Sequence, residues 1–334
     1  MLNVGVIGCG GMGKDHIKRL TNKIQGANVV AVSDVFEGRG KEAAALAGGA
    51  KVYTDGKDLI NDPDVEAVFI VSPGFAHTDS LLQAIEAGKR VFCEKPLATT
   101  AEDCKKIVDA ESASGKHLIQ LGFMRRYDKG YVQVKEALQS GEYGEPLILH
   151  CTHRNPEVGT NYNTPMAVHD TAIHEIDTLH WLVDDEYESA QVIMPKVTKY
   201  SHSELKDPQI MLLRTKKGIC IDVEVFVNCK FGYDINCEVV CEDGAIKMAE
   251  PSYPSIRKNA SVSTTIDTDC FVRFEDAYDT EVQNWVDCAE EGIINGPTAW
   301  DGYLAAVTAD ALVKAQESGQ IEPIVTAEKP EFYK

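Results

Sequence analysis

Histidine and aspartate recur at helical spacing between residues 169 and 181, in the run His-Asp-Thr-Ala-Ile-His-Glu-Ile-Asp-Thr-Leu-His-Trp. On a regular helix, Asp170, His174 and Asp177 lie within about 60° of one another. The opposite face is apolar and consists of Ala172, Ile176, Leu179 and Val183. An aspartate one turn away can orient an imidazole and stabilise its charged form. The spacing predicts a general base, His174, with Asp170 as its partner; a solvated helix face is the alternative.

A second chemical signature stands near the start of the chain, where Gly8-Cys-Gly10-Gly11-Met12-Gly13 follows an apolar run and opens a helical one. Glycines there permit a tight turn and let the backbone approach a pyrophosphate at the helix N-terminus. Asp34 ends the next strand-like run about 20 residues later, where a carboxylate can bind adenosine ribose hydroxyls. Asp34 repels a 2′-phosphate and is followed by Val35 rather than an arginine, so the pattern predicts NAD rather than NADP. A plain glycine turn and an FAD site are the weaker alternatives.

Two more polar segments end predicted strands. Ser72 and Pro73 open a segment that ends at His77, and Glu94-Lys95-Pro96 follows a later strand. The carboxyl ends of strands in an open α/β sheet face the ligand crevice. Proline restricts the conformation of the residue before it, which limits where the side chain of Lys95 points. We expect Ser72, Pro73, His77 and Glu94 at the cofactor; the alternative for Lys95 is an ordinary surface lysine.

Metal and nucleophile chemistry find less support. Strand alternation puts His150 and His153 on opposite faces, and the pair His174-Glu175 lacks the spacing of HExxH, so we expect no metal site. No GxSxG motif supports a nucleophilic serine. The pair Arg125-Arg126 is too small for a nucleic-acid patch and predicts a hydrogen-bonding corner at the domain junction, with surface arginines as the alternative.

The elements that must position these residues begin with a parallel α/β pattern. Short β-branched runs alternate with helical stretches, as βαβ units do, and most runs are continuously apolar. We predict strands over residues 2–8, 28–34, 66–72, 90–94 and 117–123, and helices over 14–25, 37–47, 78–88 and 101–114. Thr100 and Asp103 form capping-box chemistry at the last helix, which ends at Gly115.

After about residue 122 the pattern changes to helices over 130–140 and 169–183, a strand over 146–154, and then strictly alternating strands. Ile219, Ile221, Val223, Val225 and Val227 share one face, and Ile235, Cys237, Val239 and Cys241 repeat this period of two. The sequence therefore predicts an α/β protein with two domains. An N-terminal doubly wound Rossmann sheet (1–122) binds NAD, and a C-terminal α+β domain with a largely antiparallel open sheet (123–334) binds the substrate and forms oligomer contacts.

Length and net charge limit the classes of partner that the protein is expected to bind. The chain has 334 residues and a formal net charge of −19, with 52 acidic and 33 basic side chains. Such an acidic excess disfavours nucleic-acid backbones and anionic membrane surfaces. The N-terminus begins a strand at once and shows no signal-peptide pattern, and ten scattered cysteines without a CxxC pair indicate reduced core thiols. We expect a cytoplasmic protein.

These residues together resemble the glucose–fructose oxidoreductase and inositol dehydrogenase family of sugar and polyol dehydrogenases. The likeness covers essentially the whole chain, through Gly8–Gly13, Glu94-Lys95-Pro96 and Asp170-x-x-x-His174-x-x-Asp177. Longer segments are similar to the inositol-oxidising members, namely 91–100, 122–128, 153–156, 230–234 and 296–302. Their joint occurrence is specific, whereas Glu-Lys-Pro alone marks only the family.

The resemblance implies a catalytic set of Lys95, Asp170 and His174, and a Lys95–Pro96 bond that is cis. It also implies that Arg125, His153, Asn155 and Tyr233 hold hydroxyls of a small neutral polyol. The implied reaction is NAD-dependent oxidation of myo-inositol to 2-keto-myo-inositol by a homotetramer assembled through the second-domain sheet. A dehydrogenase of another polyol or aldose, such as scyllo-inositol or glucose, is one alternative, and a non-catalytic dinucleotide-bound sugar sensor is another.

Overall fold

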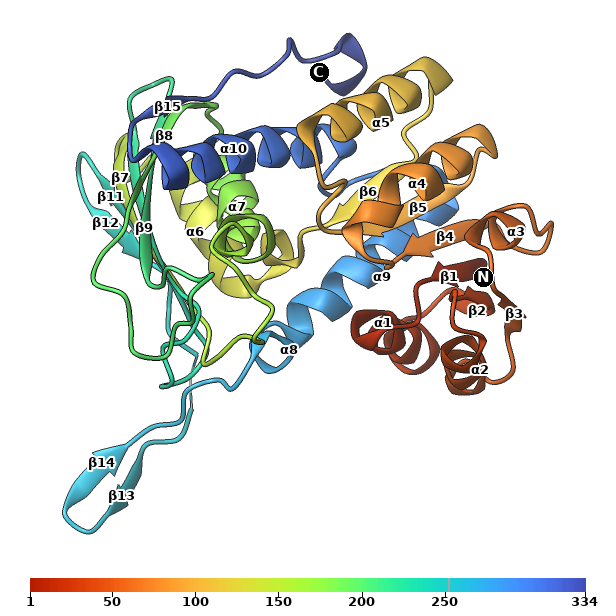
Figure 1. Ribbon diagram of the computed structural model, residues 1–334, viewed down its shortest axis with the longest axis horizontal. Coiled ribbons are helices and arrows are strands. Elements are labelled where there is room, and N and C mark those ends of the chain that lie inside the picture. Colours follow the sequence, from red (N-terminus) through yellow and green to blue (C-terminus); the bar gives the residue numbers. More distant parts are fainter. Residues whose placement is uncertain (252) are drawn as a thin grey trace. The chain divides into compact units, whose positions relative to one another are not determined.

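The computed structural model describes residues 1–251 and 253–334, and the chain divides into two compact units (Figure 1). Unit 1 contains Met1–Met124, Tyr278–Ala306 and Thr326–Lys334, and unit 2 contains Arg125–Ala277 and Val307–Val325. The predicted division into 1–122 and 123–334 is continuous, whereas the chain returns to unit 1 twice. These returns depend on long-range packing, which leaves no local pattern in the sequence.

Unit 1 is built on a six-stranded parallel sheet with the order β3-β2-β1-β4-β5-β6. The strands are β1 (Leu2–Ile7), β2 (Ala27–Ser33), β3 (Lys51–Tyr53), β4 (Ala67–Ile70), β5 (Arg90–Glu94) and β6 (Ile119–Gly122). The order reverses beside β1, so the carboxyl ends of β1 and β4 flank the switch point where ligands bind in such sheets. Five of these strands were predicted; β3 was missed because its three residues form no apolar run. The doubly wound parallel fold is thereby confirmed.

Helices cover both faces of this sheet. They are α1 (Gly11–Asn22), α2 (Glu37–Leu46), α3 (Gly56–Ile60), α4 (His77–Glu86) and α5 (Ala101–Ser114), joined by most of α9 (Glu275–Glu291) and the start of α10 (Ala299–Ser318). Thr100 caps α5 by accepting from the Asp103 N–H (3.1 Å), and Gly115 ends it with a positive φ of 68°, as predicted. In Figure 1 α4 and α5 lie side by side.

One hydrophobic core joins α1, α2 and α9 to the same face of the sheet. Its centre is Trp285 of α9, which is fully buried and meets Phe69 edge-on, with 4.8 Å between ring centroids. The indole N–H donates to the carbonyl oxygen of Val91 on β5 (3.3 Å). The return of the chain through α9 therefore completes the core beneath the first sheet.

Unit 2 contains a seven-stranded sheet with the order β12-β11-β7-β10-β9-β8-β15, in which only β7 and β10 pair in parallel. The strands are β7 (Pro146–Arg154), β8 (Tyr187–Ile193), β9 (Gln209–Thr215), β10 (Cys220–Phe226), β11 (Asp234–Cys241), β12 (Ala245–Lys247) and β15 (Glu322–Pro323). The predicted alternation on β10 and β11 is confirmed, since all nine residues that it assigned to one face are buried. The largely antiparallel C-terminal sheet follows the prediction.

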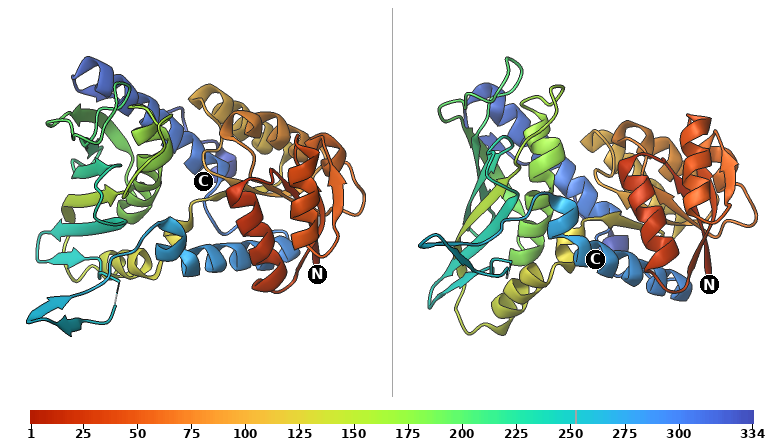
Figure 2. Two further views of the ribbon diagram at one scale, coloured as in Figure 1. Left: turned by 60° about the horizontal axis from the view of Figure 1, so that its bottom comes forward. Right: turned by 90° about the horizontal axis from the view of Figure 1, so that it is seen from below.

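The apolar face of this sheet lies against helices. In both views of Figure 2, α6 (Lys129–Ser140) and α7 (Ile173–Val183) lie on one side of it. The unit 2 part of α10 ties to β9, because the amide nitrogen of Gln316 donates to Oε1 of Gln209 (2.7 Å). Three short 3₁₀ segments, η1 (Gly74–Ala76), η2 (Met124–Tyr127) and η4 (Glu331–Tyr333), the turn α8 (Cys270–Arg273) and the exposed hairpin β13 (Ile256–Lys258) and β14 (Ser261–Ser263) complete the described elements.

The helix predicted over residues 169–183 differs from the structure in two respects. Residues Ala167–Ala172 form a π-helical segment, η3, and the α-helix begins only at Ile173. In addition, α7 is buried nearly all round, including His174 and Asp177. The division into a polar and an apolar face at 100° per residue is therefore wrong across this segment, and so is the alternative of a solvated helix surface.

All ten cysteines are free thiols, eight of them buried, as predicted. The Lys95–Pro96 bond is cis, and so is Asp207–Pro208. Among the described residues, no helix is both long enough and apolar enough to span a membrane.

Candidate active site

The glycine segment Gly8–Gly13 joins β1 to α1. A side chain would be crowded at either end of this segment but not in its middle. Gly8 has a φ of +97°, and a Cβ built on Gly13 would lie 1.9 Å from the carbonyl oxygen of Gly8. No atom lies within 4 Å of a Cβ built on Gly10 or Gly11. Gly10 caps α1 without a side-chain hydrogen bond, and Met12 is half-buried behind it. The first and last glycines close the turn, and the middle two leave the helix N-terminus open to an anion.

Asp34 lies directly after β2, and main-chain donors hold its carboxylate. Oδ2 accepts from the Cys9 N–H and Oδ1 accepts from the Phe36 N–H, both at 2.9 Å. Each oxygen keeps a second lone pair for a further donor, such as a ribose hydroxyl. Val35, which follows, is 80% exposed. This arrangement fixes the position of a negative charge beside the glycine turn.

Of the residues after β4 that were predicted at the cofactor, two are accessible and one is buried. Ser72 is half-buried and Pro73 is exposed, as a cofactor contact requires. His77 is fully buried instead, with Nδ1 2.7 Å from the carbonyl oxygen of Pro96 and Nε2 2.7 Å from that of Ser72. Both ring nitrogens thus face main-chain carbonyls, to one of which the neutral ring donates, so neither nitrogen points to a cofactor. His77 ties the loop after β4 to the loop after β5.

Glu94 is likewise buried, and both of its oxygens have protein partners. His16 on α1 places Nε2 2.8 Å from Oε1, and the main-chain N–H of Lys95 donates to Oε2 (3.1 Å). His16 is fully buried, beside the rings of Phe69, Phe92 and Tyr278. His16 was not predicted as a site residue, because its partner Glu94 lies 78 residues away in the sequence. The pair links α1 to the main chain at Lys95, whose side chain is half-buried.

Unit 2 holds the predicted general base in the first turn of α7. His174 is buried, at 9% exposure, whereas Asp170 is exposed on the π-helical turn before it. The His174 ring lies 6.5 Å from the His153 ring, measured between centroids. The structure therefore brings together two of the predicted histidines.

A buried ion pair adjoins His153. Arg125 of η2 and Glu175 of α7 are 0% and 1% exposed and form a salt bridge. His153 Nδ1 lies 2.8 Å from Oε2 of Glu175 and 3.1 Å from Nη2 of Arg125. Burial alone would raise the pKa of Glu175, but the charge of Arg125, the electrostatic interaction with His153 and the hydrogen bonds from both lower it to about 2. Glu175 was not predicted as a site residue, because its partners Arg125 and His153 lie 50 and 22 residues away in the sequence.

The remaining predicted residues of unit 2 surround this cluster. The Tyr233 ring stands edge-on to His153, with 5.8 Å between centroids, and burial raises the pKa of its phenol. Asn155, just after β7, is half-buried, and its N–H donates to the carbonyl oxygen of Phe226 (2.9 Å). Arg126 pairs with Asp177, so this aspartate is part of an ion pair with η2. The two arginines thus form a hydrogen-bonding corner, as predicted, and Glu175, His153 and Asp177 all belong to unit 2.

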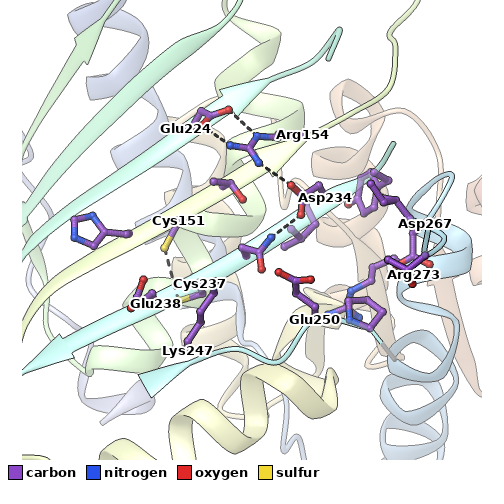
Figure 3. A pocket seen from close by; sticks show the side chains of 18 of the residues that line it. Cys151, Arg154, Glu224, Asp234, Cys237, Glu238, Lys247, Glu250, Asp267 and Arg273 are labelled. Atoms are coloured by element: carbon purple, nitrogen blue, oxygen red, sulfur yellow. Dashed lines mark hydrogen bonds and ion pairs between the residues drawn. The ribbon is translucent and has the colours of Figure 1, made fainter. Parts of the chain in front are cut away.

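The opposite face of the second sheet carries a cavity of about 530 Å³ (Figure 3). Arg154 crosses three strands there, donating to Glu224 on β10 and to Asp234 on β11, each at 2.7 Å. His150 also lies on this face, so the predicted separation of His150 from His153 is confirmed. Tyr233 is among the residues that line this cavity, whereas His153 and His174 are not, so the cavity differs from the site around those two histidines. Within the described chain, no group of three or more His, Cys, Asp or Glu residues could hold a metal ion.

The residues of unit 1 fit a bound NAD. Open space at Gly10 and Gly11 admits a pyrophosphate to an uncapped helix N-terminus, and Asp34 presents oriented carboxylate oxygens at the end of β2. The same carboxylate disfavours the 2′-phosphate of NADP.

Comparison with known proteins identifies the class. Residues 2–123 match the model of an oxidoreductase family described as an NAD-binding Rossmann fold, and residues 135–325 match the C-terminal alpha/beta domain of the same family. The chain therefore belongs to this oxidoreductase family, the one its motifs resemble, and its first unit carries the NAD-binding domain.

Individual relatives narrow the comparison. An inositol 2-dehydrogenase from Azotobacter vinelandii is 55% identical over 333 residues, which cover 99% of this chain and 98% of that protein. One from Burkholderia cenocepacia is 51% identical and covers 100% and 99%. The solved structure of myo-inositol dehydrogenase from Lactobacillus casei, in complex with NAD(H) and myo-inositol, has a TM-score of 0.98 at 45% identity and covers both chains fully. A scyllo-inositol dehydrogenase from the same organism has a TM-score of 0.91 at 25% identity, covering 98% and 100%.

Proposed function

We propose that this protein is an NAD-dependent inositol 2-dehydrogenase that oxidises myo-inositol to 2-keto-myo-inositol (scyllo-inosose). The observation that carries the proposal is identity of 51–55% with inositol 2-dehydrogenases over 99–100% of the chain. Identity with the L. casei myo-inositol enzyme is also higher than with its scyllo-inositol counterpart, 45% against 25%. A neutral polyol needs no basic surface to attract it, so the net charge of −19 is compatible with this substrate.

In this mechanism, His174 accepts the proton of the reacting hydroxyl as general base. Asp170 orients the imidazole and stabilises its cationic form. Lys95 hydrogen-bonds the same hydroxyl oxygen and steadies the charge that develops on it. Bound NAD would supply the hydride acceptor for the carbinol carbon.

The binding residues fall into two groups, one for the cofactor and one for the polyol. The glycine turn, with Gly8, Gly10, Gly11, Met12 and Gly13, holds the pyrophosphate, and Asp34 holds the adenosine ribose, with Val35, Ser72 and Pro73 beside the cofactor. His153, Asn155 and Tyr233 hold ring hydroxyls of the polyol. Glu94 and His77 serve the cofactor indirectly, by fixing the loops at Lys95 and Ser72. Arg125 contributes through its buried contacts with Glu175 and His153.

We also propose that the protein acts as a cytoplasmic homotetramer assembled through the second sheet. The family resemblance supports this assembly, and ten free thiols are compatible with a reducing compartment.

The deciding experiment measures NADH and NADPH formation across a panel of inositol isomers and aldoses. We expect NADH formation to depend strictly on added myo-inositol, with little NADPH. Activity on glucose or scyllo-inositol without activity on myo-inositol would favour a neighbouring dehydrogenase. NAD binding with no turnover of any polyol would favour a sugar sensor.

The His174→Ala variant tests the chemical role. We expect turnover to fall by about 10²–10⁴-fold, the usual contribution of a general base, while NAD affinity stays within about twofold. Steady-state kinetics and NAD titration check this outcome. His169→Ala, which removes a half-exposed histidine from the preceding turn, is the matched control. Unchanged polyol oxidation in His174→Ala would refute the assignment.

A further inference from the structure

Three buried side chains in unit 2 form a chain of contacts that ends on a predicted substrate-binding histidine. His153 lies on the inner face of β7, Glu175 in the first turn of α7, and Arg125 on η2. Their exposed fractions are 3%, 1% and 0%. The catalytic proposal assigns no role to Glu175.

The positions of the protons in this cluster follow from which of the three side chains can donate a hydrogen bond and which can only accept one. Arginine only donates, and a carboxylate that is ionised only accepts. The depressed pKa of Glu175, about 2, keeps its carboxylate ionised at neutral pH. His153 Nδ1 faces both groups, at 2.8 Å from Glu175 Oε2 and 3.1 Å from Arg125 Nη2, and it cannot satisfy both.

The contact with the Glu175 carboxylate determines which nitrogen of the neutral His153 ring carries the proton. A lone pair on Nδ1 would face a full negative charge at the shorter distance, among side chains so buried that bulk solvent screens the repulsion little. A proton on Nδ1 donates to that charge in a charge-assisted hydrogen bond, and the nearby guanidinium stays paired with Glu175 through Nη1. In the neutral ring, the lone pair therefore belongs to Nε2.

We propose that Glu175, held by Arg125, is a positioning residue that fixes the His153 ring with its proton on Nδ1, so that Nε2 accepts a hydrogen bond from a substrate hydroxyl. This role rests on the proposed inositol dehydrogenase activity. The ring of His153 stands beside that of the general base, with centroids 6.5 Å apart, and Tyr233 packs edge-on against it. The hydroxyl that His153 recognises is therefore close to the one that reacts, and Glu175 sets its direction as a donor.

The first test uses the unaltered full-length protein with NAD bound. Selective ¹⁵N labelling of histidine side chains reports which ring nitrogen carries the proton, and the His153 signals are assigned by their loss in His153→Gln. We expect a protonated Nδ1 and an unprotonated Nε2. A neutral His153 with its proton on Nε2 would overturn the proposal, whatever substrate the enzyme prefers.

The second test is a double-mutant cycle between Glu175→Gln and His153→Gln. A glutamine at 175 can donate as well as accept, so it no longer specifies the tautomer. We expect kcat/KM for myo-inositol to fall about tenfold or more in Glu175→Gln, mainly through KM, with NAD affinity within about twofold. In the His153→Gln background the same change should alter kcat/KM by less than about threefold. Equal effects in both backgrounds would show a purely structural role.

Two controls distinguish the proposed role of Glu175 from a general effect of charge removal or of poor folding. Glu186→Gln removes a half-exposed carboxylate of unit 2 that pairs with Lys216, and it should leave both kinetic constants unchanged. If Glu175→Gln folds poorly because Arg125 is left charged and unpaired, the double variant Arg125→Met/Glu175→Gln removes both charges. The same double-mutant cycle with His153→Gln is then measured in that variant. Wild-type protein that oxidises no inositol would refute the proposed function, while the NMR result would still decide the tautomer.

Discussion

Asp34 shows how a single side chain is prepared for its ligand. Two main-chain N–H groups, from Cys9 and Phe36, each donate to one of its oxygens, so the carboxylate is oriented without help from any ligand. A side chain already held in place loses little conformational freedom when it binds. The charge of Asp34 also opposes a second negative charge at the ribose, which is the basis of the preference for NAD.

The Asp34→Ser variant should therefore bind NAD about tenfold to a hundredfold more weakly, while discriminating less against NADP, because both the ribose hydrogen bonds and the repulsive charge are lost. Fluorescence titration with each dinucleotide measures the two affinities. Asp58→Ser, at an exposed position in α3, serves as the control. If the ratio of the NAD and NADP affinities does not change, Asp34 does not determine cofactor choice.

At the residue scale, the buried carboxylate of Glu175 also predicts that the free energy of unfolding depends on pH. Its pKa is about 2 in the folded protein against an ordinary value of 4.5, so folding favours the ionised form. The corresponding stability is fully present above about pH 4.5 and is lost as the pH falls from there toward 2. Urea unfolding at several pH values should show a flatter dependence in Glu175→Gln than in wild type over this window. Parallel curves would mean that other carboxylates account for the loss.

At the scale of elements, the turn between β1 and α1 separates two roles of glycine. Gly13 must lack a side chain because the helix packs directly against the carbonyl of Gly8, whereas Gly11 faces open space. The first requirement belongs to folding, and the second belongs to binding.

Gly13→Ala should lower stability by about 1–3 kcal/mol, as overpacking does, and weaken NAD binding with it. Gly11→Ala should leave Tm nearly unchanged and still weaken NAD binding, because a methyl group would obstruct the approach of the pyrophosphate. Thermal unfolding without ligand and NAD titration distinguish the two effects. Equal losses of Tm in both variants would contradict this division.

Elements also show what could be read from the sequence. Strands such as β5 and helices such as α5 were predicted at their observed bounds, because apolar runs and caps are local signals. The π-helical turn before Ile173 was not, since its hydrogen bonds depend on packing rather than residue type. The same limit applies to sites: Asp34 and His174 stand in recognisable spacings, whereas His16 and Glu175 acquire partners only through folding.

At the scale of the whole molecule, the acidic excess acts on every element at once. A formal charge of −19 at pH 7 repels itself in the compact state more than in the expanded chain. Salt screens charges that are farther apart than the Debye length, about 10 Å at 0.1 M. The buried Arg125–Glu175 pair is shielded from this effect, so the surface charges should dominate the response to salt.

Raising NaCl from about 0.02 M to 0.2 M at pH 8 should therefore raise Tm by a few degrees. The rise should shrink at pH 5.5, because the sequence pI is near 4.9 and the net charge there is smaller. Scanning calorimetry at constant protein concentration measures both, and NaCl is preferred to sulfate, which strengthens apolar burial by another route. An equal rise at the two pH values would attribute the effect to ion binding or solvent structure instead. A fall in Tm with salt would show that attractive ion pairs outweigh the repulsion of the acidic excess.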